Sequence, residues 1–239
     1  MAHSEPALVG RVAELGWLEG HLREAAAGHP RLVLVSGEAG LGKSRLASEF
    51  AALAGRTHFW VCRGRAFQDM TFPGLPFADV LRDQLADVPE VIDRVLGDDV
   101  PRLVAFARGE AALDDPQETP PTTDSFDRQM GLVVAISRAM IELARVRPTL
   151  IVIDDLQWAD GATLAQLQHL IFDVSDCLHG EPVKLLIVAI HREVDPGSAA
   201  ERAVTRIRRE SLCHTLEVGE LDEDEVRSLV TGLGIERPA

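Results

Sequence analysis

The order of apolar and polar positions along the 239 residues predicts strands that alternate with helices. Short, almost wholly apolar runs are typical of buried strands, and apolar residues three or four positions apart are typical of amphipathic helices. The predicted strands are 32–36, 57–62, 150–153, 184–190 and 214–218. The predicted helices are 11–27, 43–54, 77–86, 126–144, 163–178, 198–209 and 222–233. This alternation indicates an α/β fold, with a parallel sheet covered by helices on both faces.

Two stretches interrupt the pattern. Residues 63–76 contain glycines, prolines and aromatic residues, so we expect a loop over one edge of the sheet. The pattern is weakest over 97–123, where the segment DDPQETPPTTD is acidic and rich in proline. Because the sheet resumes beyond this segment, it does not mark a domain boundary. We expect one domain over residues 1–220 and the start of a truncated helical module over 221–239.

Composition excludes several classes of protein. A hydrophobic content of 46% and a charged content of 26% are ordinary for a globular chain. The net charge of −14 should repel nucleic-acid phosphates and anionic membranes. No apolar run approaches the roughly 18 residues of a membrane span, and we expect a cytoplasmic protein. The widely spaced Cys62, Cys177 and Cys213 are interpreted as small buried apolar residues rather than as zinc ligands.

The segment RLVLVSGEAGLGKSRLASEF, residues 31–50, reads as a buried strand, a glycine-rich turn and the start of a helix. It contains the spacing G-x-x-x-x-G-K-[ST], in which backbone amides and a helix N-terminus surround phosphate groups. Lys43 can reach the β- and γ-phosphates, and the Ser44 hydroxyl can bind Mg²⁺. The expected nucleotide-binding residues of this turn are Gly37, Glu38, Ala39, Gly40, Leu41, Gly42, Lys43, Ser44 and Arg45.

A second candidate element is TLIVIDDLQWAD, residues 149–160, in which four apolar residues lead into two adjacent acids. Asp154 and Asp155 are therefore expected at the carboxyl edge of a buried strand, where open α/β sheets bind ligands. Asp154 would hold the Mg²⁺ shell, through water, and Asp155 would orient and polarise the attacking water. The alternative is a solvated turn at the strand end that caps the next helix.

The strand in KLLIVAIHRE, residues 184–193, ends in a cation at the same edge. Arg192 can sense the γ-phosphate and stabilise charge in the transition state, although an exposed arginine after a strand is also common. His191 is interpreted as a residue that ends the strand. The chain contains no asparagine, which excludes the Asn-Lys-x-Asp motif that reads guanine. Adenine is therefore the expected base.

Four segments occur in an order that matches a known group of proteins. They are LVGR at 8–11, GEAGLGKS at 37–44, IVIDDLQWAD at 151–160 and IVAIHRE at 187–193. Together they resemble the ATPase module of the STAND class of AAA+-related P-loop ATPases. The N-terminal module of large ATP-binding LuxR-type transcriptional regulators is the most similar member. The resemblance extends over nearly the whole chain.

The resemblance implies a three-layer P-loop NTPase fold with a five-stranded sheet in the order 5-1-4-3-2. It implies that Val9, Gly10 and Arg11 lie near the adenine and ribose of ATP or ADP. Trp158 and Asp160 match a Trp-Ala-Asp extension of the family pattern, although from the residues alone Trp158 could be a core anchor and Asp160 a helix cap.

The resemblance also assigns a role to each candidate residue of the site. The catalytic residues would be Asp155, Asp154, Lys43 and Arg192, and the Mg²⁺ ligands would be Ser44 and, through water, Asp154. ATP would act as a switch ligand whose exchange and slow hydrolysis change the packing of downstream helical and winged-helix domains. Nucleotide-dependent self-association would be possible. Neither direct DNA binding nor membrane binding is expected of this piece.

Other functions remain open from the sequence. The chain could bind nucleotide without useful hydrolysis and signal through protein contacts, or it could serve a cyclase- or kinase-linked regulator. A small-molecule kinase would need an arginine-rich lid, but Arg206, Arg208 and Arg209 lie in a helical stretch and suit a solvated face. A helicase-like or replication-initiator ATPase would conflict with the negative charge.

Overall fold

The computed structural model describes residues 10–68, 72–87, 97–111, 113, 123–177 and 181–232. Five parallel strands form one sheet in the order β2-β3-β4-β1-β5. Their bounds are β1 Arg31–Ser36, β2 Trp60–Arg65, β3 Thr149–Asp154, β4 Leu185–Ile190 and β5 Cys213–Glu217. The predicted α/β class and the predicted strand order are both confirmed.

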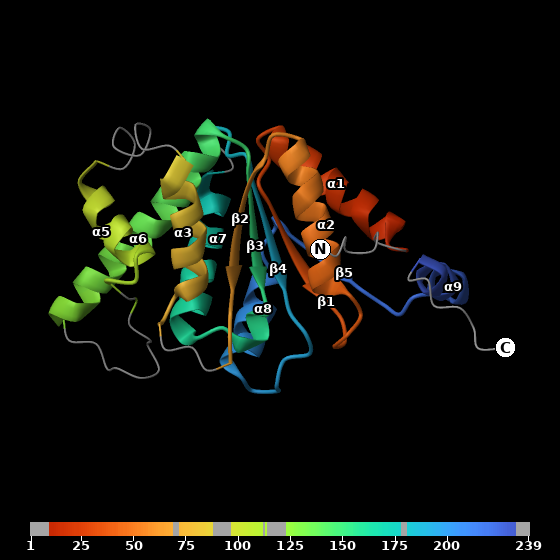
Figure 1. Cartoon of the computed structure of the whole chain (residues 1–239). Coiled ribbons are helices and arrows are strands. Elements are labelled where there is room, and N and C mark those ends of the chain that lie inside the picture. The colour runs from red at the N-terminus through yellow and green to blue at the C-terminus, as the bar shows by residue number, and fades with distance from the viewer. Residues whose placement is uncertain are drawn as a thin grey trace, which may run out of the picture.

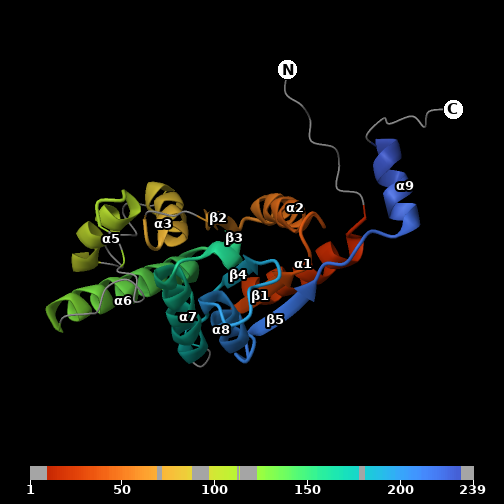
Figure 2. The ribbon, with the colours of Figure 1, turned by 90° about the horizontal axis from the view of Figure 1, so that it is seen from below.

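Helices cover both faces of the sheet, so that the domain has three layers (Figures 1 and 2). The bounds of the helices are α1 Val12–Ala26, α2 Lys43–Arg56, α3 Leu75–Asp87, α5 Val100–Ala107, α6 Thr123–Val146, α7 Gly161–Asp176, α8 Ala199–Ile207 and α9 Glu223–Gly232. Short 3₁₀ turns occupy Gly97–Asp99 and Leu156–Trp158. Helices α1 and α2 pack on one face, and α7 and α8 pack on the other together with α3, α5 and α6.

The alternation of side chains along each strand divides the apolar residues between two cores. In β1, Leu32 and Leu34 belong to the core under α7 and α8, whereas Val33 and Val35 belong to the core under α1 and α2. Successive side chains of a strand point to opposite faces, which explains why β1 reads as a continuous apolar run. The sheet is therefore buried on both sides, and its polar chemistry is confined to the strand ends.

The strand register brings the carboxyl ends of β1 to β4 to one edge. Val35 pairs with Ile190, Ile153 pairs with Ala189, and Arg65 pairs with Asp154. The residues that follow these strands therefore start from neighbouring positions along that edge. The glycine-rich turn, the two acids and Arg192 all meet there.

The structure corrects the predicted second strand. We predicted residues 57–62, but β2 begins at Trp60 and continues to Arg65, so residues 63–65 belong to the sheet rather than to a loop. Helix α2 runs on to Arg56, and the Thr57 hydroxyl donates to the Ala54 carbonyl 2.9 Å away. The start of the strand is shifted because threonine ends the helix rather than opening the strand.

A helix was also missed between residues 97 and 123. Helix α5 has Pro101 in its first turn, where a proline costs no hydrogen bond, and buries Leu103, Phe106 and Ala107 against α3 and α6. Its eight residues span too few turns to give a clear apolar period.

Cys62 is fully buried as predicted, whereas Cys177 and Cys213 are only partly buried, which corrects their interpretation. Among the described helices, none has both the length and the apolar character needed to cross a membrane.

Candidate nucleotide-binding site

The turn between β1 and α2 has the backbone shape that its glycines permit. Gly37, Gly40 and Gly42 all have positive φ, and Gly42 is the N-cap of α2. A side chain at Gly37 is excluded by sterics as well, because a Cβ there would lie 2.4 Å from the Val218 carbonyl oxygen. The turn therefore places its amides and the amino end of a 14-residue helix at the sheet edge.

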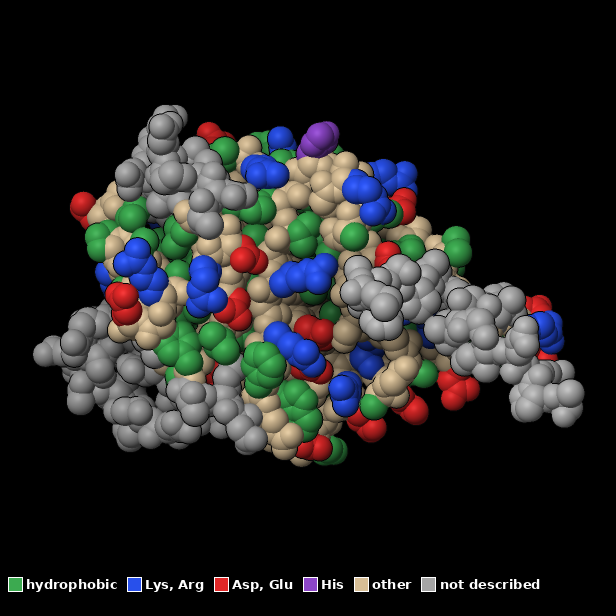
Figure 3. Space-filling model, in the orientation of Figure 1, with side chains coloured by type: hydrophobic (Ala, Val, Ile, Leu, Met, Phe, Trp, Pro, Cys, Tyr) green, Lys and Arg blue, Asp and Glu red, His purple; other side chains and the backbone are tan. Residues whose placement is uncertain are grey.

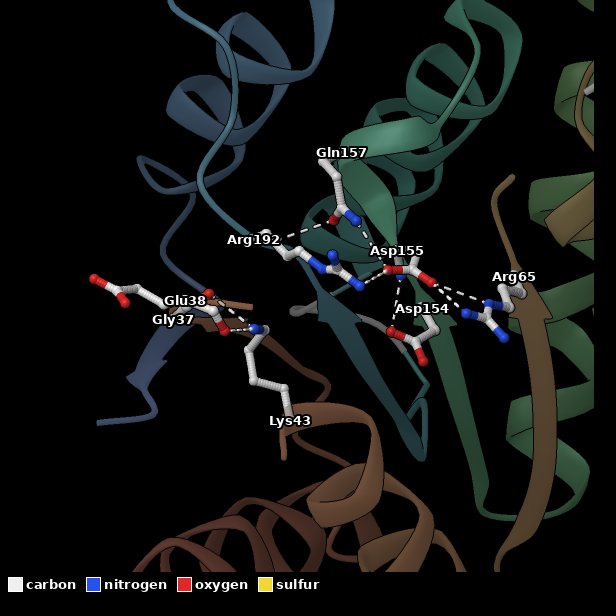
Figure 4. Close-up of polar contacts among 8 residues, drawn as sticks. All are labelled: Gly37, Glu38, Lys43, Arg65, Asp154, Asp155, Gln157 and Arg192. Atoms are coloured by element: carbon white, nitrogen blue, oxygen red, sulfur yellow. Dashed lines mark hydrogen bonds and ion pairs between the residues drawn. The ribbon is translucent and has the colours of Figure 1, made fainter. Parts of the chain in front are cut away.

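Lys43, the first residue of α2, is almost wholly buried, with 6% of its surface exposed. Its Nζ donates to the carbonyl oxygens of Gly37 and Glu38 at 2.8 and 2.5 Å, so the ammonium group is held inside the turn (Figure 4). Burial lowers the pKa of Lys43, as does the charge of Arg192, while Asp154 and Asp155 oppose the shift. Taking anionic groups into the turn would favour the charged form of this lysine.

The two acids lie at the end of β3, as predicted. Asp154 is the last residue of the strand, and its Oδ1 accepts a hydrogen bond from the Asp155 amide at 2.8 Å. Asp155 has φ 58° and ψ 41°, a left-handed conformation that is uncommon for residues other than glycine. This turn directs the Asp155 side chain across the sheet edge. Only 7% of the surface of Asp155 is exposed. Such strained positions cluster at functional sites.

Asp155 is the centre of a polar network that joins three strand ends. Arg65 donates to Asp155 Oδ2 through Nε at 3.0 Å and through Nη2 at 2.8 Å. Gln157 Nε2 donates to Asp155 Oδ1 at 2.8 Å, and Arg192 Nη2 lies 3.8 Å from the same oxygen. The Arg192 amide also donates to Gln157 Oε1 at 3.1 Å. Figure 4 shows the two arginines approaching the carboxylate from opposite sides.

This network sets the ionisation of the carboxylate. Burial would raise the pKa of Asp155, but hydrogen bonds from Gln157 and Arg65, with the charges of Arg65 and Arg192, hold that pKa below its ordinary value. Asp155 is therefore ionised and engaged on both oxygens. A carboxylate with a lowered pKa is a weaker base than a free one.

A cavity of about 220 Å³ lies between the turn and the acids. Its walls contain Gly40, Gly42, Lys43, Ser44, Arg45, Asp154, Asp155, Gln157, Ile190, His191 and Arg192. A second cavity, of about 510 Å³, adjoins it through His191 and Arg192 and reaches the segment after β5. The smaller cavity thus unites the turn, the paired acids and the arginine that the sequence placed at one edge.

The family described as "AAA ATPase domain" matches residues 7–188 of the chain. The chain belongs to this AAA ATPase family. It is therefore the ATPase module of an AAA+-type protein, from a family of nucleotide hydrolases. A search of curated proteins found no significant match to the chain.

Several solved structures share the fold. The Aeropyrum pernix ORC2 protein, solved in ADPNP–ADP complexes, superposes with a TM-score of 0.54 at 13% identity over 97% of this chain and 53% of that one. The Aeropyrum pernix ORC1 protein, solved with DNA, superposes with a TM-score of 0.51 at 18% identity over 98% of this chain and 51% of that one. Cdc6p from Pyrobaculum aerophilum superposes with a TM-score of 0.51 at 12% identity over 97% of this chain and 51% of that one. At these identities the likeness concerns the fold alone, and the chain spans about half the length of each structure.

Residues of the expected adenine side lie beside the turn but are engaged in structural contacts. Arg11 Nη2 donates to the carbonyl oxygens of Leu41 and Gly219 at 3.2 and 2.6 Å, and its Nη1 pairs with Glu14 at 2.8 Å. Gly10 precedes it in a left-handed conformation, next to α9. The remaining expected contact, Val9, lies outside the described residues.

Asp160 is the N-cap of α7 in this AAA ATPase domain, with its Oδ1 2.7 Å from the Thr163 amide. The helix-cap interpretation is confirmed. Trp158 is 39% exposed, so the core-anchor interpretation is wrong. The 3₁₀ turn that contains Trp158 sends its side chain outward and buries Leu156 instead.

Sequence reasoning missed Arg65 and Gln157, the two residues that hold Asp155. Arg65 is 90 positions away along the chain and lies in a segment predicted to be a loop. A signal was available: the apolar run of residues 60–62 is followed by alternation of small and polar residues over 62–65, Cys-Arg-Gly-Arg, which is the pattern of an edge strand that ends in a cation.

Proposed function

We propose that this AAA ATPase domain binds ATP or ADP with Mg²⁺ in the smaller cavity and hydrolyses ATP slowly, as a regulatory switch. One observation carries the proposal. The glycine-rich turn, with Lys43 and Ser44, faces Asp154, Asp155 and Arg192 across a single cavity. Amides and an ammonium group suit a polyphosphate, and carboxylates across from them suit magnesium and water.

The donor set fits Mg²⁺ in this proposal. The Ser44 hydroxyl is exposed at the cavity, and Asp154 contributes a carboxylate whose Oδ1 is occupied by the Asp155 amide. Hydroxyl, carboxylate and water oxygens are the ligands that this hard cation prefers. Ser44 would bind the ion directly and Asp154 through water, and the bound ion would neutralise phosphate charge.

The remaining roles follow the geometry. Lys43 would leave the carbonyl oxygens of the turn and bind the β- and γ-phosphates, and the turn 37–45 would supply the amides. Asp155 would accept a proton from the attacking water, and Arg192 would stabilise charge on the γ-phosphate. Asp155 would become a stronger base on releasing one of its partners, because their hydrogen bonds and charges lower its pKa. The network around Asp155 therefore supports a slow resting activity.

A regulatory role is supported by the end of the described chain. Helix α9 follows β5, lies beside Gly10 and leaves Val226 and Val230 partly exposed. In the proposal, residues 1–220 form the nucleotide-binding domain and 221–239 begin a helical lid. Its nucleotide-dependent packing would signal to downstream helical and winged-helix domains or drive self-association. The resemblance to STAND-class modules of LuxR-type transcriptional regulators favours a transcriptional protein over a cyclase- or kinase-linked one.

The second candidate function is nucleotide binding without hydrolysis, which the engagement of Asp155 also supports. Single-turnover assays with radiolabelled ATP and Mg²⁺ separate the two. We expect the native domain to release phosphate above background and Asp155→Asn to bind ATP but release none. Binding by both proteins with equal, background-level phosphate release would leave only the binding function.

For the base, we propose adenine, with Val9, Gly10 and Arg11 nearby. Calorimetry should give tighter binding of ATP than of GTP, and equal affinities would contradict this assignment.

Direct DNA binding is not proposed, although the Aeropyrum pernix ORC1 protein was solved with DNA. The net charge is −14, and the described residues on the face in Figure 3 intersperse acidic with basic side chains rather than forming a continuous basic patch. A gel shift at physiological salt should show no complex.

A further inference from the structure

His191 is a buried imidazole at the junction of the two cavities. It follows β4 directly, it lines both cavities, and only 4% of its surface is exposed. Its backbone amide donates to the Val35 carbonyl at 2.9 Å, which fixes it against the strand that leads into the glycine-rich turn. The backbone of His191 is therefore fixed beside the strand that leads into the turn.

One ring nitrogen of His191 has a partner and the other has none in the described part of the chain. Nδ1 lies 2.6 Å from the Arg192 carbonyl oxygen, and a carbonyl can only accept, so Nδ1 carries the proton. Nε2 is buried without a hydrogen-bond partner. In the neutral ring, Nε2 is consequently a bare acceptor, and a buried polar atom in that state costs free energy until a ligand or water satisfies it.

Burial, together with two nearby cations, keeps the His191 ring neutral. Burial lowers the pKa of His191, and the charges of Arg208 and Lys43 lower it further, while the hydrogen bond to the Arg192 carbonyl opposes the shift. Carboxylates also line the cavities: Asp154 and Asp155 in the smaller one, and Glu38, Glu193, Glu217 and Glu220 in the larger one. The balance of these groups leaves the ring neutral at pH 7.

A polyphosphate in the smaller cavity would reverse this balance. Its negative charge would pair with Lys43 and offset Arg208, and phosphate oxygens accept hydrogen bonds but do not donate them. The proposal requires Nε2 to lie against these oxygens when nucleotide is bound: a neutral Nε2 there would be repelled, whereas a protonated one would donate a charge-assisted hydrogen bond. We propose that His191 is a second nucleotide-sensing residue, which takes up one proton from solvent on Nε2 when ATP binds and donates it in a hydrogen bond to a phosphate oxygen.

The proposal gives His191 a role in coupling. The same residue bonds the carbonyl of Arg192, whose side chain reaches Asp155. Protonation of the ring would therefore strengthen this existing hydrogen bond to Arg192 when phosphate is present. ATP binding would become tighter as pH falls through the physiological range, by several-fold between pH 8 and pH 6.5, because each linked proton changes affinity by at most about tenfold per pH unit.

This inference rests on the proposed ATP site, and calorimetry can separate failure of one from failure of the other. Binding of Mg·ATP is measured at pH 7 in buffers of different ionisation enthalpy, for the native domain, His191→Gln and His29→Gln. His29 is the matched control, since it is exposed and lies before β1 at the opposite edge of the sheet. The difference in proton uptake between variants cancels the titration of the nucleotide itself.

We expect the native domain and His29→Gln to take up the same fraction of a proton, and His191→Gln to take up less while still binding ATP. Equal uptake by all three proteins would overturn the inference but leave the ATP site intact. Absence of ATP binding by the native domain would overturn the site and the inference together.

A second measurement needs no variant. Long-range ¹H–¹⁵N spectra of histidine-labelled native protein should show His191 as the Nδ1–H tautomer alone and doubly protonated with Mg·ATP. A ring that stays neutral in the complex contradicts the proposal.

Discussion

The guanidinium group of Arg65, at the end of β2, holds one carboxylate oxygen of Asp155, at the end of β3, with two hydrogen bonds of 3.0 and 2.8 Å. The Asp155 side chain is nearly buried, whereas 58% of the Arg65 side chain is exposed. The Arg65 side chain can therefore turn into solvent, and this movement would free Asp155.

Replacing Arg65 should accelerate hydrolysis. In Arg65→Ala the pKa of Asp155 rises toward its ordinary value, because two hydrogen bonds and a positive charge are lost. A stronger and less encumbered base should raise the single-turnover rate by roughly two- to tenfold. Arg63→Ala, two residues earlier on the same exposed side of β2, is the control and should leave the rate unchanged. A rate that falls in Arg65→Ala alone would mean that Arg65 assists catalysis.

Lys43→Ala should abolish ATP binding and leave the fold intact. The Nζ of Lys43 bonds only carbonyl oxygens of an otherwise exposed turn, which water can satisfy after the substitution. The chain contains one other lysine, Lys184, just before β4 at the opposite edge of the sheet. Calorimetry of Lys184→Ala should match the native domain, and circular dichroism should be the same for all three proteins. Unchanged ATP affinity in Lys43→Ala would refute the placement of phosphate in this turn.

Gly64→Ala should destabilise the domain through the contact between β2 and α3. A Cβ at Gly64 would lie 2.2 Å from the Pro76 carbonyl oxygen, so the two backbones must separate at a cost of roughly 1–3 kcal/mol. Gly20→Ala is a control of opposite sign. Gly20 lies in α1 with open space around it, and alanine there should stabilise by about 0.5–1 kcal/mol. Urea unfolding of both variants checks the pair, and equal stability of Gly64→Ala and the native domain would contradict it.

The parts of the site that follow from the sequence are those encoded over a few consecutive residues. The glycine-rich turn and the paired acids each need a strand, a turn and particular side chains at a fixed spacing. All three can be read from a short stretch of the sequence. The order of the strands came from the family resemblance rather than from the residues, because nothing local specifies which strands are neighbours.

The parts that the sequence did not reveal depend on distant contacts. The role of Arg65 arises from the pairing of β2 with β3, and it was hidden because the predicted strand ended at Cys62, three residues too early. The left-handed turn at Asp155 is not encoded by a glycine. His191 was dismissed as a strand end, because only the packed structure shows that one of its nitrogens is buried without a partner.

A cluster on the edge strand should make stability depend on pH. Trp17 and His21 of α1 contact each other, and His21 packs against His214 of β5 with ring centroids 4.3 Å apart. Burial lowers the pKa of His21, and the neighbouring charge of His214 lowers it further. Glu24 raises this pKa and Arg31 lowers it, both with smaller effects. Burial also lowers the pKa of His214. Both rings are thus neutral in the folded domain at pH 7.

The sign of the effect follows from these directions. A histidine whose folded pKa lies below its ordinary value of about 6.5 gives stability that is complete above that value and is lost as pH falls through the folded pKa. The unfolding temperature should therefore fall between pH 7.5 and pH 5, and the fall should be smaller in the double variant His21→Gln, His214→Gln. The comparison with the native domain cancels the contributions of the carboxylates and of His191 to the pH dependence, because these groups are present in both proteins. Parallel curves for the two proteins over this range would show that the two imidazoles do not couple α1 to β5 through their charge.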